Sequence, residues 1–112
     1  MPTMVKAGVY SATMHYLKAI KALGSKDPLK VMEEMRQTPI NDFMTHNGQL
    51  RIDGRVVRDM YLLQVKKPEE SKGPWSYAKI IETVPRDKAH RPLNAGGCPL
   101  VEAAKKDVSQ TK

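Results

Sequence analysis

Few residues in this sequence have the types and the spacing that chemistry requires. The three histidines, His15, His46 and His90, are dispersed, and none belongs to a closely spaced histidine pair of the kind that holds a metal. The adjacent carboxylates Glu33 and Glu34 would point in different directions on a helix, which argues against a paired acid and base. The sequence therefore predicts no metal, no cofactor and no catalytic residues, and we expect a protein that is not an enzyme.

Nucleophiles and phosphate-binding loops are also poorly represented. Cys98 is the only cysteine, so the chain can form neither an internal disulfide nor a cysteine zinc site. We interpret it as a packed or idle thiol, or as one that pairs with a cysteine outside this chain. Ser11 and Ser25 lie in no nucleophile-elbow pattern. The glycines of "NAGG" lack the preceding strand and the following helix of a phosphate-binding loop.

The size and charge of the chain narrow the function classes further. Its 112 residues suffice for at most one domain, and 40% hydrophobic and 28% charged residues are typical of a globular chain. The net charge of +7 could attract nucleic acid, but the lysines and arginines are spread along the chain rather than clustered. Nucleic acid is therefore not the expected partner. A standalone basic α/β module that binds nucleic acid or a protein stays as the alternative.

The sequence contains no segment that resembles a membrane span or a leader. No apolar run approaches the roughly 20 residues that a membrane-spanning helix needs. The first residues, "MPTMVKAGVYSATMHYL", have no apolar core followed by a cleavage site, so they do not form a signal peptide. A chain expressed as it stands is expected in the cytoplasm.

Two amphipathic helices are expected in the first third of the chain. Apolar residues recur at helical spacing over about 9–23, and Gly24 follows as a left-handed cap. Asp27 and Pro28 then form an N-cap and first-turn pair that begins a second helix at about 28–36. Because the link between them is very short, we expect the two helices to pack against each other.

The periodicity then changes to that of strands. Asp53 and Gly54 lie between two short apolar runs, which predicts a hairpin at about 49–58 with a type I′ turn, in which both residues have positive φ. Two further strands are expected at about 60–66 and about 75–83. The first of these, "MYLLQVK", is apolar on both faces, and such a strand belongs in a sheet that is covered on both sides.

We divide the chain into residues 1–84, which hold these elements, and residues 85–112, which we expect to form an extended C-terminal segment with a polar end. Two short helices can cover only one side of a sheet. A monomer would therefore expose apolar surface, and we expect a homo-oligomer formed by edge pairing or strand exchange.

The order of these elements resembles a known family. Three segments carry the resemblance: "AGVYSATMHYLKAIKALGSKDPLKVMEEMR", "NGQLRIDGRVVRDMYLLQVKKPEESKGPW" and "RPLNAGGCPL". Together they are similar to the C-terminal end of a type I periplasmic solute-binding protein. The most similar group is the Leu/Ile/Val-binding subunits of ABC transporters, including members that take aromatic acids and amides. The resemblance covers about residues 2–101.

The resemblance implies an α/β fold with two lobes and a ligand cleft between them, of which this chain would be a truncated C-terminal portion. It implies a non-enzymatic receptor for an amino acid or a small organic or aromatic acid, which acts in the periplasm with a membrane permease. Most ligand contacts would lie outside this chain, so the chain alone is not expected to bind. Ala7 and Tyr10 correspond to the cleft-facing stretch and are the predicted ligand-binding residues. Tyr10 has the alternative of being a core aromatic.

Overall fold

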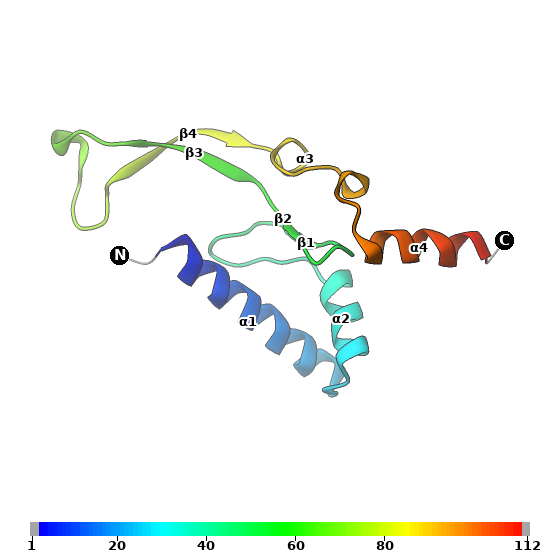
Figure 1. The fold of residues 1–112 in the computed structure, drawn as a ribbon. Coiled ribbons are helices and arrows are strands. Elements are labelled where there is room, and N and C mark those ends of the chain that lie inside the picture. Colours follow the sequence, from blue (N-terminus) through cyan, green and yellow to red (C-terminus); the bar gives the residue numbers. More distant parts are fainter. Residues whose placement is uncertain (1–2, 111–112) are drawn as a thin grey trace.

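The structure is a computed structural model that describes residues 3–110, with the side chains of residues 3–104. It is of mixed α/β class, as the sequence predicts, and begins with α1 (Met4–Leu23) and α2 (Pro28–Gln37) (Figure 1). Thr3 accepts a hydrogen bond from the Lys6 N–H at 3.4 Å and so starts α1 at Met4, earlier than the apolar spacing suggests. Gly24, with φ of 61°, ends α1.

The two helices enclose much of the small core. The Asp27 carboxylate accepts hydrogen bonds from the Leu29 and Lys30 N–H groups and fixes the start of α2 directly after the short link. The two helices pack on each other, and α2 also packs on the following hairpin. The buried apolar side chains come from both helices, from the segment between α2 and the hairpin, from the hairpin and from the start of the last helix: Ala19, Val31, Ile40, Leu50, Val57 and Val101.

The hairpin consists of β1 (Gln49–Leu50) and β2 (Val56–Val57), which pair antiparallel. Its turn differs from the expected type I′ turn, because Gly54 has a positive φ of 79° and Asp53 does not. The strands are instead joined by residues 51–55, where the Gly54 N–H donates to the Arg51 carbonyl at 3.0 Å. The Asp53 carboxylate is held by the Arg51 side chain and the Arg55 N–H, which favours this wider loop.

A long ribbon of two strands, β3 (Met60–Val65) and β4 (Ala78–Val84), follows the hairpin. Every residue of β3 is exposed, so its apolar side chains lack partners on both faces, as predicted. The expected strand at 75–83 starts later, because residues before Ala78 form a turn in which the Ser76 N–H donates to the Gly73 carbonyl at 3.2 Å. The turn of 3-10 helix η1 (Pro68–Glu70) lies between the two strands.

The prediction that the C-terminal segment is extended is wrong in part. Residues after β4 form the short helix α3 (Arg86–Ala89), the turn η2 (Leu93–Gly96) and the helix α4 (Pro99–Gln110). Prolines precede or begin each of these elements, and a proline at the first helical position starts a helix rather than stopping one. The half-buried Cys98 provides the carbonyl that accepts the Val101 N–H at 3.0 Å as α4 begins.

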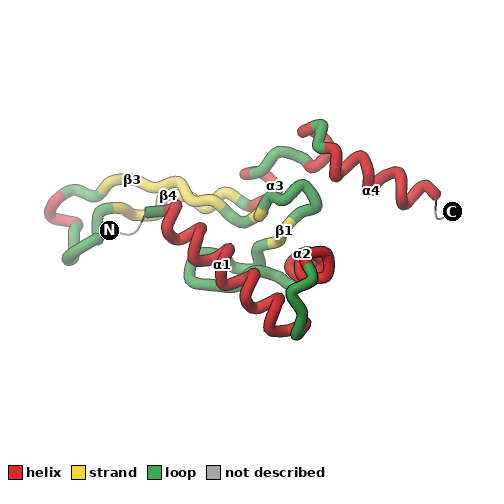
Figure 2. Tube along the Cα trace, turned by 60° about the horizontal axis from the view of Figure 1, so that its bottom comes forward, coloured by secondary structure: helices red, strands yellow, loops and turns green. Residues whose placement is uncertain are grey.

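The chain as a whole is elongated. Its radius of gyration is 17.9 Å, whereas a compact chain of this length has a radius of about 13 Å. The ribbon β3–β4 and the helix α4 project from the helices and the hairpin, as the tube in Figure 2 shows. The strands of the ribbon pack chiefly on each other. Apolar faces of α1 and of the ribbon are therefore left open.

Candidate functional site

A cavity of about 290 Å³ lies between α1, α2 and the hairpin. Its walls are mostly apolar, with polar groups at a few points. The cavity is lined by Gly8, Ser11, Ala12, His15, Met35, Ile40, Met44, Leu50, Gly54, Val56 and Arg58. A concave apolar site with few polar groups is the usual form of a small-molecule pocket, in which the polar groups orient the ligand.

The polar side chains of the cavity are held by hydrogen bonds to the protein. The buried Ser11 hydroxyl donates to an Asp42 carboxylate oxygen, which ties α1 to the loop before the hairpin. The half-buried Arg58 donates through Nη1 to the hydroxyl of the buried Thr45 at 3.2 Å. The buried His15 lies with Nε2 2.9 Å from the Met35 carbonyl oxygen, and it donates there because a carbonyl can only accept.

The carboxylate of Asp42 accepts several hydrogen bonds that hold this loop together. It accepts the N–H groups of Met44 and Thr45 at 2.9 and 2.8 Å. Desolvation by burial would raise the pKa of Asp42, but the hydrogen bonds from Ser11, Met44 and Thr45 and the positive charge of Arg58 outweigh it and lower that pKa. Asp42 is therefore held as a carboxylate that organises the loop.

These groups do not form a catalytic relay. Ser11 directs its proton at the Asp42 carboxylate, whose lowered pKa makes it a weak base, and His15 is engaged with a backbone carbonyl of α2. Among residues 3–110, no group of three or more His, Cys, Asp and Glu side chains could hold a metal ion. In that same part of the chain, no helix is long and apolar enough to span a bilayer. The arrangement is suited to packing and to binding.

The predicted ligand-binding residues lie beside this cavity rather than on its walls. Ala7 is half-buried in the first turns of α1, and Tyr10 is 53% exposed in this chain. The Tyr10 ring contacts the ring of Phe43, with centroids 5.4 Å apart and an interplanar angle of 59°. Gly8 and Ser11, their helical neighbours, line the cavity instead.

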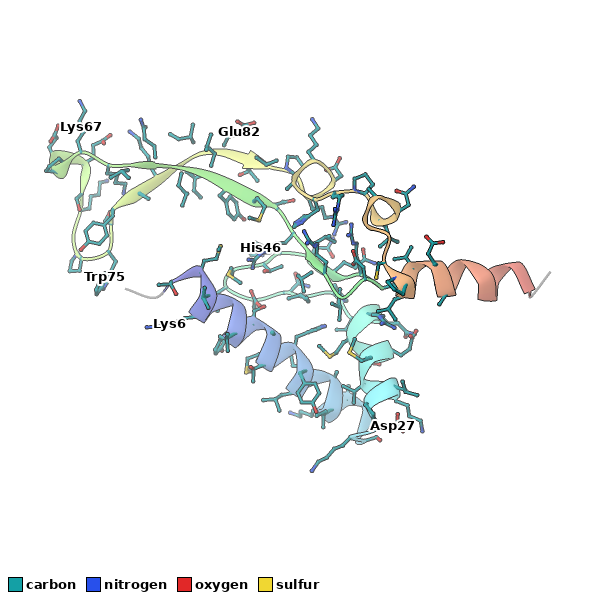
Figure 3. The ribbon with its side chains drawn as sticks, viewed as in Figure 1. Lys6, Asp27, His46, Lys67, Trp75 and Glu82 are labelled. Atoms are coloured by element: carbon teal, nitrogen blue, oxygen red, sulfur yellow. The ribbon has the colours of Figure 1, made fainter. Side chains whose placement is uncertain are left out.

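Phe43 is the residue that sequence reasoning missed. It is 67% exposed on the loop between α2 and β1, where it lies against Tyr10 although the two are far apart in the sequence. Figure 3 shows the side chains of this end of α1, near the labelled Lys6, and of the loop that carries His46. The two rings in contact form an exposed apolar surface.

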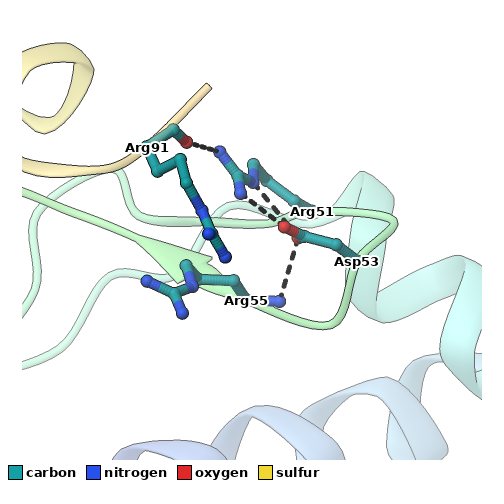
Figure 4. A network of polar contacts seen from close by, with 4 residues as sticks. All are labelled: Arg51, Asp53, Arg55 and Arg91. Carbon is teal, nitrogen blue, oxygen red and sulfur yellow. Dashed lines mark hydrogen bonds and ion pairs between the residues drawn. The ribbon is translucent and has the colours of Figure 1, made fainter. Parts of the chain in front are cut away.

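A second polar cluster connects the hairpin to the C-terminal segment. Arg51 pairs with Asp53 and donates through Nη1 to the Arg91 carbonyl at 2.9 Å (Figure 4). The hydrogen bond from Arg51 lowers the pKa of Asp53. Arg86 donates its N–H to Asp59 at 2.9 Å and its Nη1 to the Asn47 carbonyl at 2.8 Å. Residues 86–91 are thus fixed on the hairpin by polar contacts.

Comparisons with known proteins agree with the resemblance seen in the sequence. A family model described as "Periplasmic binding protein" matches residues 1–74. A branched-chain amino acid ABC transporter periplasmic ligand-binding protein from Burkholderia xenovorans LB400 is 46% identical, with a TM-score of 0.83, over 89% of this chain and 27% of that chain. A periplasmic binding protein from Burkholderia mallei is 43% identical, with a TM-score of 0.81, over 89% of this chain and 26% of that one. No curated protein matches. The chain spans about a quarter of the length of these two structures.

Proposed function

Because the chain belongs to the periplasmic binding protein family, we propose that it is part of the solute-binding component of an ABC transporter for amino acids or small organic or aromatic acids. The observation that carries this proposal is the 46% identity along 89% of the chain to a protein described as a ligand-binding component of such a transporter. The protein acts as a receptor and not as an enzyme. Its partners are the ligand and a membrane permease, and its compartment is the periplasm.

Ala7 and Tyr10 are our proposed contacts to the ligand. The exposed Tyr10–Phe43 pair supports this proposal, because it offers an apolar aromatic surface at the open end of α1. Such a surface suits a branched aliphatic or an aromatic side chain, since aromatic rings pack well on both. The cavity beside it is enclosed by side chains already held in hydrogen bonds, so we assign it to the support of this surface.

The chain corresponds to a portion of the fold of its relatives, and we propose that it does not bind ligand alone. Two observations support this: the chain spans about a quarter of its structural relatives, and the apolar residues of β3 are exposed on both faces. The same open faces are the basis for the proposed homo-oligomer of the isolated chain. The alternative of a basic module for nucleic acid is not favoured by the family match.

A chimera tests the proposed function. The chain replaces the matching segment of the Burkholderia xenovorans protein, and leucine, isoleucine, valine and benzoate are titrated calorimetrically into the chimera, the parent protein and the isolated chain. We expect the chimera to bind a ligand of the parent, and the isolated chain to bind none. A chimera that folds like the parent but binds none of the parent's ligands would contradict the proposal.

Substitution in the chimera tests the proposed contact. Tyr10→Ala is expected to weaken ligand binding about tenfold, which corresponds to about 1.4 kcal/mol. Tyr16→Ala is the matched control, because Tyr16 is an exposed tyrosine on the same helix (45% exposed). Equal effects of the two substitutions would show that Tyr10 has no special role.

A further inference from the structure

A second pocket, of about 210 Å³, lies where the end of α2 meets the start of the hairpin and the side chain of Arg86. Its lining is polar and contains two arginines and three amide side chains. The lining residues are Arg36, Gln37, Pro39, Asn47, Gly48, Gln49 and Arg86. No carboxylate is among these lining residues, so nothing on the walls neutralises the two positive charges.

Arg36 is the unusual member of this lining. Its Nε is buried and has no hydrogen-bond partner within the described part of the chain. Burying a charged donor without a partner is costly, so such a group calls for an explanation. The nearest carboxylates on the same helix are already engaged: Glu33 accepts from Gln37 at 2.6 Å and Glu34 from Thr38 at 2.9 Å.

Arg86 is the second arginine of this lining, and its position is fixed by hydrogen bonds. Its backbone N–H is bound to Asp59, and its Nη1 donates to the Asn47 carbonyl at 2.8 Å. A guanidinium carries five N–H donors, and this is the one side-chain bond that Arg86 makes to residues 3–104, whose side chains are described. Arg86 is therefore held in position with most of its donors still available.

We propose that this pocket binds a small oxyanion, such as inorganic phosphate or a free carboxylate, between the guanidinium groups of Arg36 and Arg86. Charge-assisted hydrogen bonds from arginine to carboxylate or phosphate are among the strongest in proteins, and both groups accept two parallel N–H bonds. A pocket of 210 Å³ exceeds the roughly 30 Å³ that one liquid water occupies several-fold. It therefore has room for such an anion with some water.

Two properties of the chain favour the binding of an anion in this pocket. Because no hydrogen bond holds the Arg36 Nε in place, a rotation of this side chain toward an anion breaks no existing bond. The net charge of +7 also attracts anions to the surface. This site shares no residue with the Tyr10–Phe43 surface, so it is independent of the proposed solute-binding function.

The site is tested by NMR of the arginine Nε–H signals while sodium phosphate, sulfate or acetate is added to the full chain. Sodium chloride at equal ionic strength is the control for screening. We expect saturable shifts of the Arg36 and Arg86 signals, whereas Arg55, an exposed arginine outside the pocket, does not respond. Shifts with all three anions identify a general oxyanion site, and shifts with only phosphate and sulfate identify a site for tetrahedral dianions.

Arginine variants distinguish anion binding at this pocket from a general attraction of anions to the positively charged surface. Arg36→Gln and Arg86→Gln are each expected to raise the dissociation constant for phosphate about tenfold, the equivalent of about 1.4 kcal/mol, while Arg55→Gln leaves it within twofold. Arg36→Lys keeps the positive charge and serves as the control for misfolding. Because a lysine ammonium lacks the planar, forked N–H donors of a guanidinium, we expect it also to weaken phosphate binding. Linear, non-saturating shifts, equal responses at Arg55 and Arg36, or a dissociation constant that Arg36→Lys and Arg36→Gln leave unchanged would overturn the proposal.

Discussion

His15 on α1 lies with Nε2 2.9 Å from the carbonyl oxygen of Met35 on α2, and this bond satisfies a group that the helix itself leaves open. In an α-helix the Met35 carbonyl would accept the N–H of residue 39, which is Pro39 and has none. The imidazole, which is 5% exposed, fills that role. His15 therefore joins the two helices at the point where α2 ends, and the sequence rule that proline stops a helix explains why a partner is needed.

Replacement of His15 should destabilise the fold. His15→Leu removes the donor and leaves the partly buried Met35 carbonyl without a partner, which costs about 1–3 kcal/mol. Urea unfolding measures the change in the free energy of unfolding. His46→Leu is the control, because His46 is exposed, and we expect a change within about 0.5 kcal/mol. Equal stability of the two variants would show that the bond to Met35 contributes nothing.

Asp42 should make stability depend on pH in the acid range. Burial opposes ionisation, but hydrogen bonds from Ser11, Met44 and Thr45 and the charge of Arg58 lower the pKa of Asp42 below its ordinary value of 3.8. A lowered pKa means that the unfolded chain binds the proton more tightly, so the stabilisation is present above pH 3.8 and is lost as the pH falls through the pKa of the folded state.

The comparison of Asp42→Asn with the unsubstituted chain isolates this contribution. Unfolding free energies measured from neutral pH downward should fall less steeply below pH 3.8 in the variant. Ser11→Ala removes one donor to the carboxylate and should have an intermediate slope. Parallel curves for the three proteins would mean that the carboxylate is not stabilised in the folded state.

Gly48 should not tolerate a side chain. A Cβ at this position would lie 2.3 Å from Thr45 Cγ2 and 3.5 Å from Ile40 Cβ, and both neighbours are buried. Gly48→Ala is expected to destabilise the chain by about 1–3 kcal/mol. Gly8→Ala provides the matched control, because Gly8 is in α1 and a Cβ there meets nothing within 4 Å. That change should stabilise by about 0.5–1 kcal/mol, as thermal unfolding can test.

The ribbon should drive self-association of the isolated chain. Leu63 and Ile80 are paired across β3 and β4 and are 57% and 61% exposed, next to open strand edges. Sedimentation at micromolar concentration should give a species larger than the 12.6 kDa monomer. Leu63→Lys should shift it toward the monomer, whereas Thr83→Lys, at an exposed polar position of β4 paired with Tyr61, should change it little. A monomeric unsubstituted chain would contradict this prediction.

Features that depend on neighbouring residues could be predicted from the sequence. Gly24 and the Asp27–Pro28 pair act within one helical turn, so the bounds of the link between α1 and α2 follow from local rules. The exposure of β3 could also be predicted, since its apolar side chains outnumber what two short helices can cover. An extended segment was expected after residue 84, so the C-terminal helices were missed, although Pro99 begins α4 at a position where proline favours a helix start.

Contacts between distant residues could not be predicted in this way. The Tyr10–Phe43 pair and the bond from Ser11 to Asp42 depend on how the loop after α2 folds back along α1. Nothing in the types or spacing of these residues indicates that loop path. The same holds for Arg36 and Arg86, which are fifty positions apart in the printed sequence and meet at one pocket. The division between residues 1–84 and 85–112 stays a prediction.

We propose that the open faces of the ribbon are interior surfaces of a larger solute-binding fold. The most direct test of this proposal is the rate at which a thiol at Leu63→Cys, in a Cys98→Ser background, reacts with a thiol reagent in the dilute isolated chain and in the Burkholderia xenovorans chimera. Lys88→Cys, at an exposed position, serves as the reference in both proteins. We predict a reaction at least about tenfold slower in the chimera at position 63, with an unchanged rate at position 88. Equal rates at position 63 in the two proteins would show that the larger fold does not cover this face of the ribbon.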